Sequence, residues 1–103
     1  MSEVNVTAVI YPKPEKFDEV AALFSQVATK VQEHEPDTLL YYAFQVREKH
    51  EIVVVERYKN QAAVQTHVQA PYFREFAAQL PALSAKPWEL RAGGFLSRGV
   101  SRL

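Results

Sequence analysis

Two ionisable residues of this sequence, His67 and Glu56, fall where folding should remove them from water. His67 shares a predicted helix face with Val64 and Val68, so its imidazole should point toward a sheet and could accept a proton near neutral pH. Glu56 ends an apolar strand, where burial would raise its pKa and suit it to act as a base or as a partner of His67. The two residues are therefore candidates for proton-transfer catalysis.

Each of these residues also has a purely structural interpretation. A buried, hydrogen-bonded core histidine would account for His67. A structural ion pair would account for Glu56, and the available cations nearby are Arg57, Arg91 and Lys59. The residues alone leave both interpretations open.

Aromatic residues are dense for so short a chain. They could line a flat apolar cavity with a few phenolic hydroxyl groups, although core packing alone would explain most of them. The candidates for substrate binding are Tyr41, Tyr58, Phe73, Phe76 and Trp88.

The sequence lacks the motifs that several other classes of reaction require. His34 and His50 fall in predicted turns, the chain has no cysteine, and no pair of His or carboxylate residues has a metal-ligand spacing. A glycine-rich phosphate loop, a nucleophile elbow and a dinucleotide fingerprint are also missing from the sequence, and these serve phosphoryl transfer, Ser-based hydrolysis and hydride transfer. We therefore expect neither a metal nor a cofactor.

Charge and composition limit the kinds of molecule that this protein is expected to bind. Twelve Lys and Arg balance twelve Asp and Glu, so the basic surface that nucleic acids or anionic membranes require is not predicted, and a small neutral ligand is favoured. The apolar stretch after Glu3 is broken by Asn5 and Thr7 and is too short for a signal-peptide core or a membrane span. Together with the lack of cysteine, this pattern predicts a cytoplasmic protein.

The elements that would position these residues begin with a strand and a long helix. Residues 4–11 alternate as a strand does, and Pro14 suits the first turn of a helix that should end near Glu35, before Pro36. One apolar stripe follows the helical period: Phe17, Val20, Phe24, Val27 and Val31. This stripe must pack against a sheet.

The rest of the chain predicts a hairpin, two short helices and a last strand. Residues 39–46 and 52–58 form the hairpin, and Asn60 caps a short helix that continues through His67 to Val68. Pro71 starts a second helix to Leu80, and Pro81 and Pro87 frame a connector. Residues 88–96 form the last strand, with a bulge or close backbone approach at Gly93 and Gly94.

This order is the β-α-β-β-α-β pattern of a ferredoxin-like α+β domain with a four-stranded antiparallel sheet. At 103 residues the chain should be one domain, residues 1–103. The two helices of this pattern can cover only one face of the sheet, yet residues 39–46 and 52–58 carry apolar side chains on both faces. A second sheet should cover the other face, which predicts a homodimer.

Three stretches together resemble the antibiotic biosynthesis monooxygenase family over nearly the whole chain. They are Glu35-Pro36-Asp37-Thr38-Leu39 leading to Tyr41; Val54-Val55-Glu56-Arg57-Tyr58 followed by Ala62-Ala63 and His67; and Pro71-Tyr72-Phe73 with Phe76. The resemblance implies that two sheets meet face to face as a dimeric α+β barrel. Asp37 departs from the family, which usually has Gly there, so the turn should be strained or reshaped.

The resemblance also implies a range of activities. The haem-degrading branch of the family carries a haem-ligating His where this sequence has Ala77, so haem degradation is disfavoured. The polyketide-oxidising branch has a Trp near His67 and a Tyr near Phe73, so its polar pocket is not reproduced. What remains is cofactor-independent oxidation of a small aromatic substrate, a quinol, phenol or anthrone-like ring, by O₂, with His67 or Glu56 removing a proton.

Two alternative functions belong to other functional classes. A related barrel can isomerise or cyclise a substrate with only a proton-transfer residue. It can also bind a small molecule or a partner without turnover. The place expected for any site is the space between the sheet and the helix that carries His67.

Overall fold

The computed structural model describes residues 2–102, so Met1 and Leu103 of the expected domain lie outside the described residues. The elements run in this order: β1 (Val4–Pro12), a 3₁₀ turn (Pro14–Lys16), α1 (Phe17–His34), β2 (Thr38–Val46), a 3₁₀ turn (Arg47–Lys49), β3 (Glu51–Tyr58), α2 (Gln61–Gln69), α3 (Pro71–Leu83) and β4 (Ser84–Gly93). The four strands form one antiparallel sheet in the order β2-β3-β1-β4. The ferredoxin-like α+β prediction is therefore confirmed.

Helix α1 forms as its periodicity predicts. All five residues of its apolar stripe are buried against the sheet and α3. The helix ends at His34, because Pro36 disfavours helical backbone in the residue before it, and the Glu35 N–H closes the last turn on the Val31 carbonyl at 2.9 Å. His34 thus belongs to the helix, and its predicted place in a turn was wrong.

The short helices begin where their capping residues predict. The Asn60 side chain accepts a hydrogen bond from the Ala63 N–H at 2.9 Å, and Pro71 occupies the first turn of α3. The prediction that Pro81 starts a connector was wrong, because α3 continues through it to Leu83. A proline this close to a helix end removes only one hydrogen bond, and the buried side chains of Leu80 and Leu83 hold the last turn.

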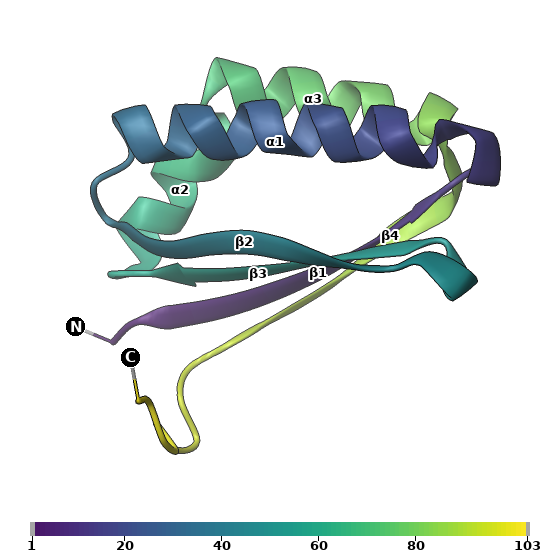
Figure 1. Cartoon of the computed structure of the whole chain (residues 1–103). Helices are drawn as coiled ribbons and strands as arrows, with labels where there is room; N and C mark the ends of the chain where they lie inside the picture. Colours follow the sequence, from purple (N-terminus) through teal and green to yellow (C-terminus); the bar gives the residue numbers. More distant parts are fainter. Residues whose placement is uncertain (1, 103) are drawn as a thin grey trace.

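Strand β4 also begins and ends earlier than expected, at Ser84 and Gly93, so Pro87 lies within it. A Cβ placed on Gly93 or Gly94 would meet nothing within 4 Å, so the predicted close approach there was wrong. The register instead shifts between Val9 and Pro12 of β1, where that strand pairs with the start of β4. Residues after Gly93 turn back below the sheet (Figure 1).

The two faces of the sheet differ. Figure 1 shows α1, α2 and α3 on one face, while the opposite face carries no helix in the part of the chain that the structure describes. On that open face β2 presents apolar side chains to water, with Leu40 37%, Tyr42 47% and Phe44 49% exposed. Among residues 2–102, none of the helices is long and apolar enough to span a membrane.

Candidate functional site

The centre of the candidate site is a buried pair, Glu35 and His67. Glu35 follows the last turn of α1, His67 lies on α2, and the two residues are 5% and 1% exposed. Nδ1 of His67 is 3.0 Å and 3.1 Å from the two carboxylate oxygens of Glu35. A carboxylate accepts hydrogen bonds, so Nδ1 carries the proton and Nε2 of a neutral imidazole keeps its lone pair. This Nε2 is buried and has no hydrogen-bond partner.

Two further side chains fix the Glu35 carboxylate. The Thr38 hydroxyl donates to Oε1 at 2.8 Å, and the Tyr72 hydroxyl donates to Oε2. Thr38 opens β2 and Tyr72 lies in the first turn of α3, so β2, α2 and α3 all contribute donors to this carboxylate. Such a network orients His67, because its acceptor cannot rotate without breaking other hydrogen bonds.

Aromatic rings surround the imidazole. The ring centroids of Phe73, Tyr41 and Tyr58 lie 4.5, 5.0 and 5.7 Å from that of His67. Trp88 does not touch His67 but stacks on Phe73 at 6.1 Å. Of the five residues predicted to bind substrate, three therefore contact His67 directly, Trp88 follows behind Phe73, and Phe76 is buried in the core between α1, α3 and the sheet.

Glu56 has a different partner from those expected. Arg57 pairs with Glu3 at 3.5 Å and Arg91 with Glu89 at 3.6 Å, while Glu56 accepts a hydrogen bond from the Tyr58 hydroxyl. The structural alternative, an ion pair of Glu56 with Arg57, Arg91 or Lys59, was therefore wrong. The reason is the period of a strand, which places residues 56 and 58 on the same, helix-covered face and Arg57 on the other.

Burial decides the ionisation of this cluster. Loss of water raises the pKa of Glu56, which outweighs the opposing effects of the Tyr58 hydrogen bond and of His67. Burial likewise raises the pKa values of the Tyr41, Tyr58 and Tyr72 hydroxyls, which therefore stay protonated donors at neutral pH. The cluster thus combines one buried histidine that is a possible base with several buried groups that hold protons.

Sequence reasoning missed Glu35 as a functional residue, having used it only to mark the helix end and the family resemblance. A signal was present, because position 35 follows Val31 by four residues and so extends the inward stripe of α1 beyond the last helical residue. A carboxylate on an apolar stripe requires a buried partner. Asp37, by contrast, does not adopt a left-handed backbone conformation. Among the non-glycine residues that the structure describes, a positive φ is found at His50 and not at Asp37.

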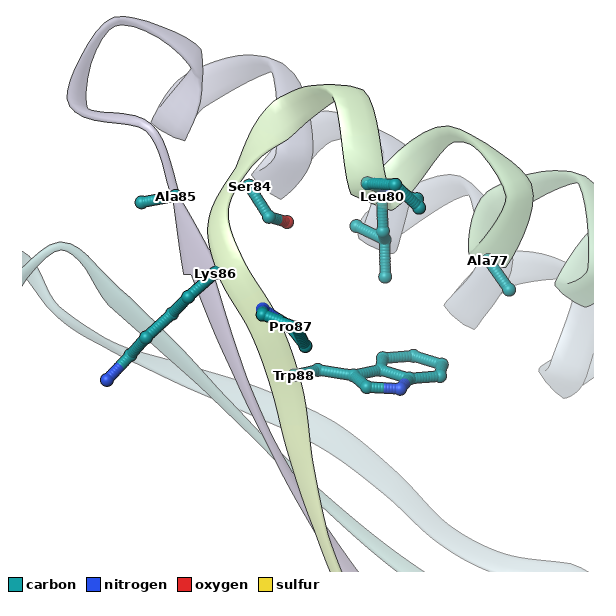
Figure 2. A pocket seen from close by; sticks show the side chains of 8 residues that line it. Ala77, Leu80, Ser84, Ala85, Lys86, Pro87 and Trp88 are labelled. Carbon is teal, nitrogen blue, oxygen red and sulfur yellow. The ribbon is translucent and has the colours of Figure 1, made fainter.

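Hollows border the cluster on two sides. Glu35 lines two clefts near the start of β2, of about 300 Å³ and 190 Å³, of which the smaller is mainly polar. Trp88 lines a pocket of about 410 Å³ between α3 and β4 (Figure 2). The space expected between the sheet and α2 is itself filled by the imidazole and its aromatic neighbours. Within residues 2–102, no group of three or more His, Cys, Asp or Glu residues is arranged to hold a metal ion.

Comparisons with known proteins agree with this fold. The chain is 36% identical over 89 residues to the uncharacterized protein sll1783 of Synechocystis, which covers 85% of this chain and 60% of that protein. Among solved structures, Rv0793 of Mycobacterium tuberculosis has a TM-score of 0.88 at 24% identity and covers 96% of this chain and 100% of its own. A conserved protein of Methanosarcina mazei has a TM-score of 0.82 at 22% identity and covers 91% of this chain and 93% of its own.

At such identities the solved structures show a shared fold and no more. The family model described as antibiotic biosynthesis monooxygenase matches residues 4–79, from the start of β1 to well within α3. That span includes Glu35, Glu56 and His67. The chain therefore belongs to the antibiotic biosynthesis monooxygenase family.

Proposed function

We propose that this protein is a cofactor-independent monooxygenase that oxidises a small aromatic substrate, a quinol, phenol or anthrone-like ring, with O₂. The observation that carries the proposal is the state of His67, which is buried, held at Nδ1 by Glu35 and without a partner at Nε2. An unpartnered buried nitrogen costs free energy in the empty protein and is satisfied when a ligand hydroxyl or acidic C–H occupies its hydrogen-bonding position.

In the proposed reaction, Nε2 of His67 takes a proton from the substrate and Glu35 stabilises the imidazolium that results. Glu35 is thus a positioning residue, since it selects the tautomer and faces the new positive charge without touching the substrate. The aromatic shell of Tyr41, Tyr58 and Phe73 excludes water from the substrate anion. A desolvated anion gives an electron to O₂ more readily than the neutral ring does.

The electrons of this reaction come from the substrate. In an anthrone-like ring, a methylene group becomes a carbonyl that contains one oxygen atom of O₂, and the two methylene hydrogens leave with the other oxygen atom as water. Atoms and electrons balance without a further reductant. The protein contributes proton removal, orientation and a dry environment.

Glu56 has a supporting role in this proposal. Its burial favours the neutral carboxylic acid, which can donate a hydrogen bond to oxygen anions that form in the cluster. The Tyr58 hydroxyl already donates to Oε1 of Glu56 and fixes its orientation. The change Glu56→Gln keeps an acceptor for Tyr58 and an N–H donor but removes the acidic proton, so it tests proton transfer from Glu56 separately from hydrogen bonding.

The test is O₂ consumption by metal-stripped protein with a panel of quinols and anthrones. His67→Ala should lower kcat/KM by about 10² to 10⁴-fold, the usual contribution of a general base. The matched control is His50→Asn, because His50 is exposed in the turn before β3 and Asn tolerates its left-handed backbone. Undiminished turnover in the double variant His67→Ala, Glu56→Gln would refute the assigned roles.

A specific observation also favours isomerisation or cyclisation as a second candidate. Nε2 of His67 has no hydrogen-bond partner, and burial raises the pKa of neighbouring Glu56, so an acceptor nitrogen lies near a carboxyl group that holds its proton more tightly than usual. Such a pair can move a proton from one substrate atom to another without O₂. Equal product formation under nitrogen would support this second function and exclude the first.

The proposed assembly is a homodimer in which the open sheet faces meet. Members of the family are typically dimeric, and the open face of β2 exposes apolar residues that water disfavours. Phe44→Asp should weaken self-association by at least about 30-fold, because a charge would be buried at a central contact. Ala78→Asp, on the exposed side of α3, is the control. Sedimentation that shows equal association for both variants would contradict this arrangement.

A further inference from the structure

The two edges of the sheet differ in how they are protected against a further strand. The strand order places β2 at one edge and β4 at the other. An exposed edge strand offers unpaired backbone groups to other chains, and charged side chains and proline are common protections. β4 carries both, among them Lys86 and Pro87 (Figure 2). β2 has neither in its nine residues, so its edge is open to a further strand.

An apolar groove lies beside this unprotected edge. Between α1 and β2 is a hollow of about 480 Å³, whose mainly apolar wall includes Phe24, Ala43 and Ile52. Toward the start of β2 follows the cleft of about 190 Å³ that Glu35 lines together with residues 38–41. A strand added to β2 would therefore lie along an apolar groove and across the cleft beside Glu35.

The tail, residues 94–102, carries apolar side chains that its own subunit leaves in water. Leu96 is fully exposed and Val100 is 74% exposed. The tail is attached by an ion pair instead, in which Arg98 lies 3.4 Å from Glu3. Residues four apart in an extended strand share one face. Leu96 and Val100 would therefore lie on the same face if the tail formed a strand.

The position of the tail suits the β2 edge of a second copy better than that of its own subunit. Figure 1 shows the tail below the sheet, on the open face. Its own β2 lies at the far edge, three strand spacings or about 14 Å from β4. Crossing that distance would use about four residues of the tail and leave too few to follow the edge. A second copy packed on the open face would instead meet the tail directly.

The charge of the tail also matches this edge. The segment from residue 94 to the end of the sequence contains Arg98 and Arg102 and no acidic residue. Asp37 is exposed just before β2, and the buried carboxyl group of Glu35 lines the adjoining cleft. A basic segment is therefore attracted to the end of β2 that borders the candidate site.

We propose that, in the homodimer, the tail of each subunit adds to the β2 edge of its partner as an extra strand and covers the cleft beside Glu35. The inference rests on the proposed homodimer, to which it adds the segment that protects each exposed edge. Backbone hydrogen bonds hold the strand, and Leu96 and Val100 occupy the apolar groove. Gly99, at a φ of +56°, can become extended because glycine has no Cβ to restrict it.

The first test compares two double variants of the full chain by sedimentation. Leu96→Asp, Val100→Asp should weaken self-association at least about tenfold, because two apolar contacts are lost and two charges must be dehydrated. Ser97→Asp, Ser101→Asp adds the same charges to the opposite face of the strand and should change self-association less than about threefold. Equal weakening by both pairs would show that charge alone acts, and would overturn the role of Leu96 and Val100.

The second test locates the contact. A peptide of residues 94–102 is titrated to millimolar concentration into ¹⁵N-labelled Leu96→Asp, Val100→Asp protein. It should move the amide cross-peaks of β2 saturably, including those of Thr38 and Leu39 beside the cleft, and should slow hydrogen exchange at the outward-facing amides of β2. The control peptide carries the same two Asp substitutions and should leave the cross-peaks unmoved.

Two outcomes of this titration would count against the proposal. Unmoved β2 cross-peaks, or changes confined to β4, would overturn the edge site. Changes that spare Thr38 and Leu39 would overturn the covering of the cleft beside Glu35.

These results are separable from the proposed homodimer. If Phe44→Asp dissociates the protein while Leu96→Asp, Val100→Asp self-associates as wild type does, the homodimer stands and the role of the tail fails. If wild type is a monomer and the peptide nevertheless binds at β2, the edge site stands and the proposed homodimer fails.

Discussion

Each face of the sheet carries a tyrosine that donates a hydrogen bond to a glutamate, and the two carboxyl groups behave in opposite ways. Under the helices, Tyr58 donates to Glu56, and burial raises the pKa of that carboxyl. On the open face, Tyr11 donates to Glu89, and this hydrogen bond lowers the pKa of the carboxyl. The same pair of groups thus favours the neutral acid on one face and the carboxylate on the other, because water decides the balance.

The comparison explains where proton chemistry can occur in this fold. On the covered face, two carboxyl groups and one imidazole lie within one buried cluster, those of Glu35, Glu56 and His67. On the open face, the charges of Lys86, Glu89 and Arg91 remain in contact with water or with one another. A base gains its reactivity on the covered face because its partners are few and fixed.

The largest expected difference between the faces is in stability. Glu35→Ala should lower the free energy of unfolding by about 3 to 5 kcal/mol, because it leaves His67 and two hydroxyls buried without their acceptor. Glu89→Ala on the open face should cost far less, since water replaces the lost contacts. Urea unfolding of both variants in the dissociated Phe44→Asp background compares these losses, because the proposed homodimer would cover the open face. Equal losses in that background would remove the distinction between the two faces.

A smaller difference should follow removal of each tyrosine hydroxyl. Tyr58→Phe leaves a Glu56 oxygen buried without a donor and should cost about 1 to 3 kcal/mol. Tyr11→Phe should cost much less, because Glu89 can turn to water and the ring still lies under the Lys86 ammonium. Thermal unfolding monitored by circular dichroism compares the two. A Tyr11→Phe loss as large as that of Tyr58→Phe would remove the distinction drawn between the faces.

The parts of the fold that follow from local rules could be predicted from the sequence. Every position of the α1 stripe is buried, and Asn60 caps α2, because periodicity and capping depend on near neighbours. Pro81 does not end α3 as the local preference of proline would suggest. Burial of Leu80 and Leu83 in the core stabilises the last turn by more than the one lost hydrogen bond costs.

The candidate site was only half predictable for the same reason. His67 and its aromatic neighbours were found because their types and spacing indicate an inward face. Its partner Glu35 lies 32 residues earlier and meets it only because the fold places the segment between α1 and β2 beside α2. Glu56 was assigned cations that lie on the opposite face, whereas the period of two points to Tyr58.

The smallest and most diagnostic effect is the pH dependence of stability. Glu56 has a folded-state pKa above its ordinary value of 4.5, so its contribution to stability is full below that value and is lost as the pH rises through the folded-state pKa. Glu56→Gln removes this loss and keeps an acceptor for Tyr58. The unfolding temperature of Glu56→Gln relative to wild type should therefore increase as the pH rises above 4.5 toward neutrality.

Glu89→Gln should show the opposite slope. Its folded-state pKa lies below 4.5, so its contribution is present above that value and is lost as the pH falls through the folded-state pKa. The variant should therefore fall further behind wild type as the pH rises, with a smaller amplitude because solvent screens the site. Unfolding temperatures of both variants across the acidic range, each in the dissociated Phe44→Asp background, give the two slopes. Parallel slopes would mean that both carboxyl groups meet the same environment in the single subunit, and the distinction between the faces would fail.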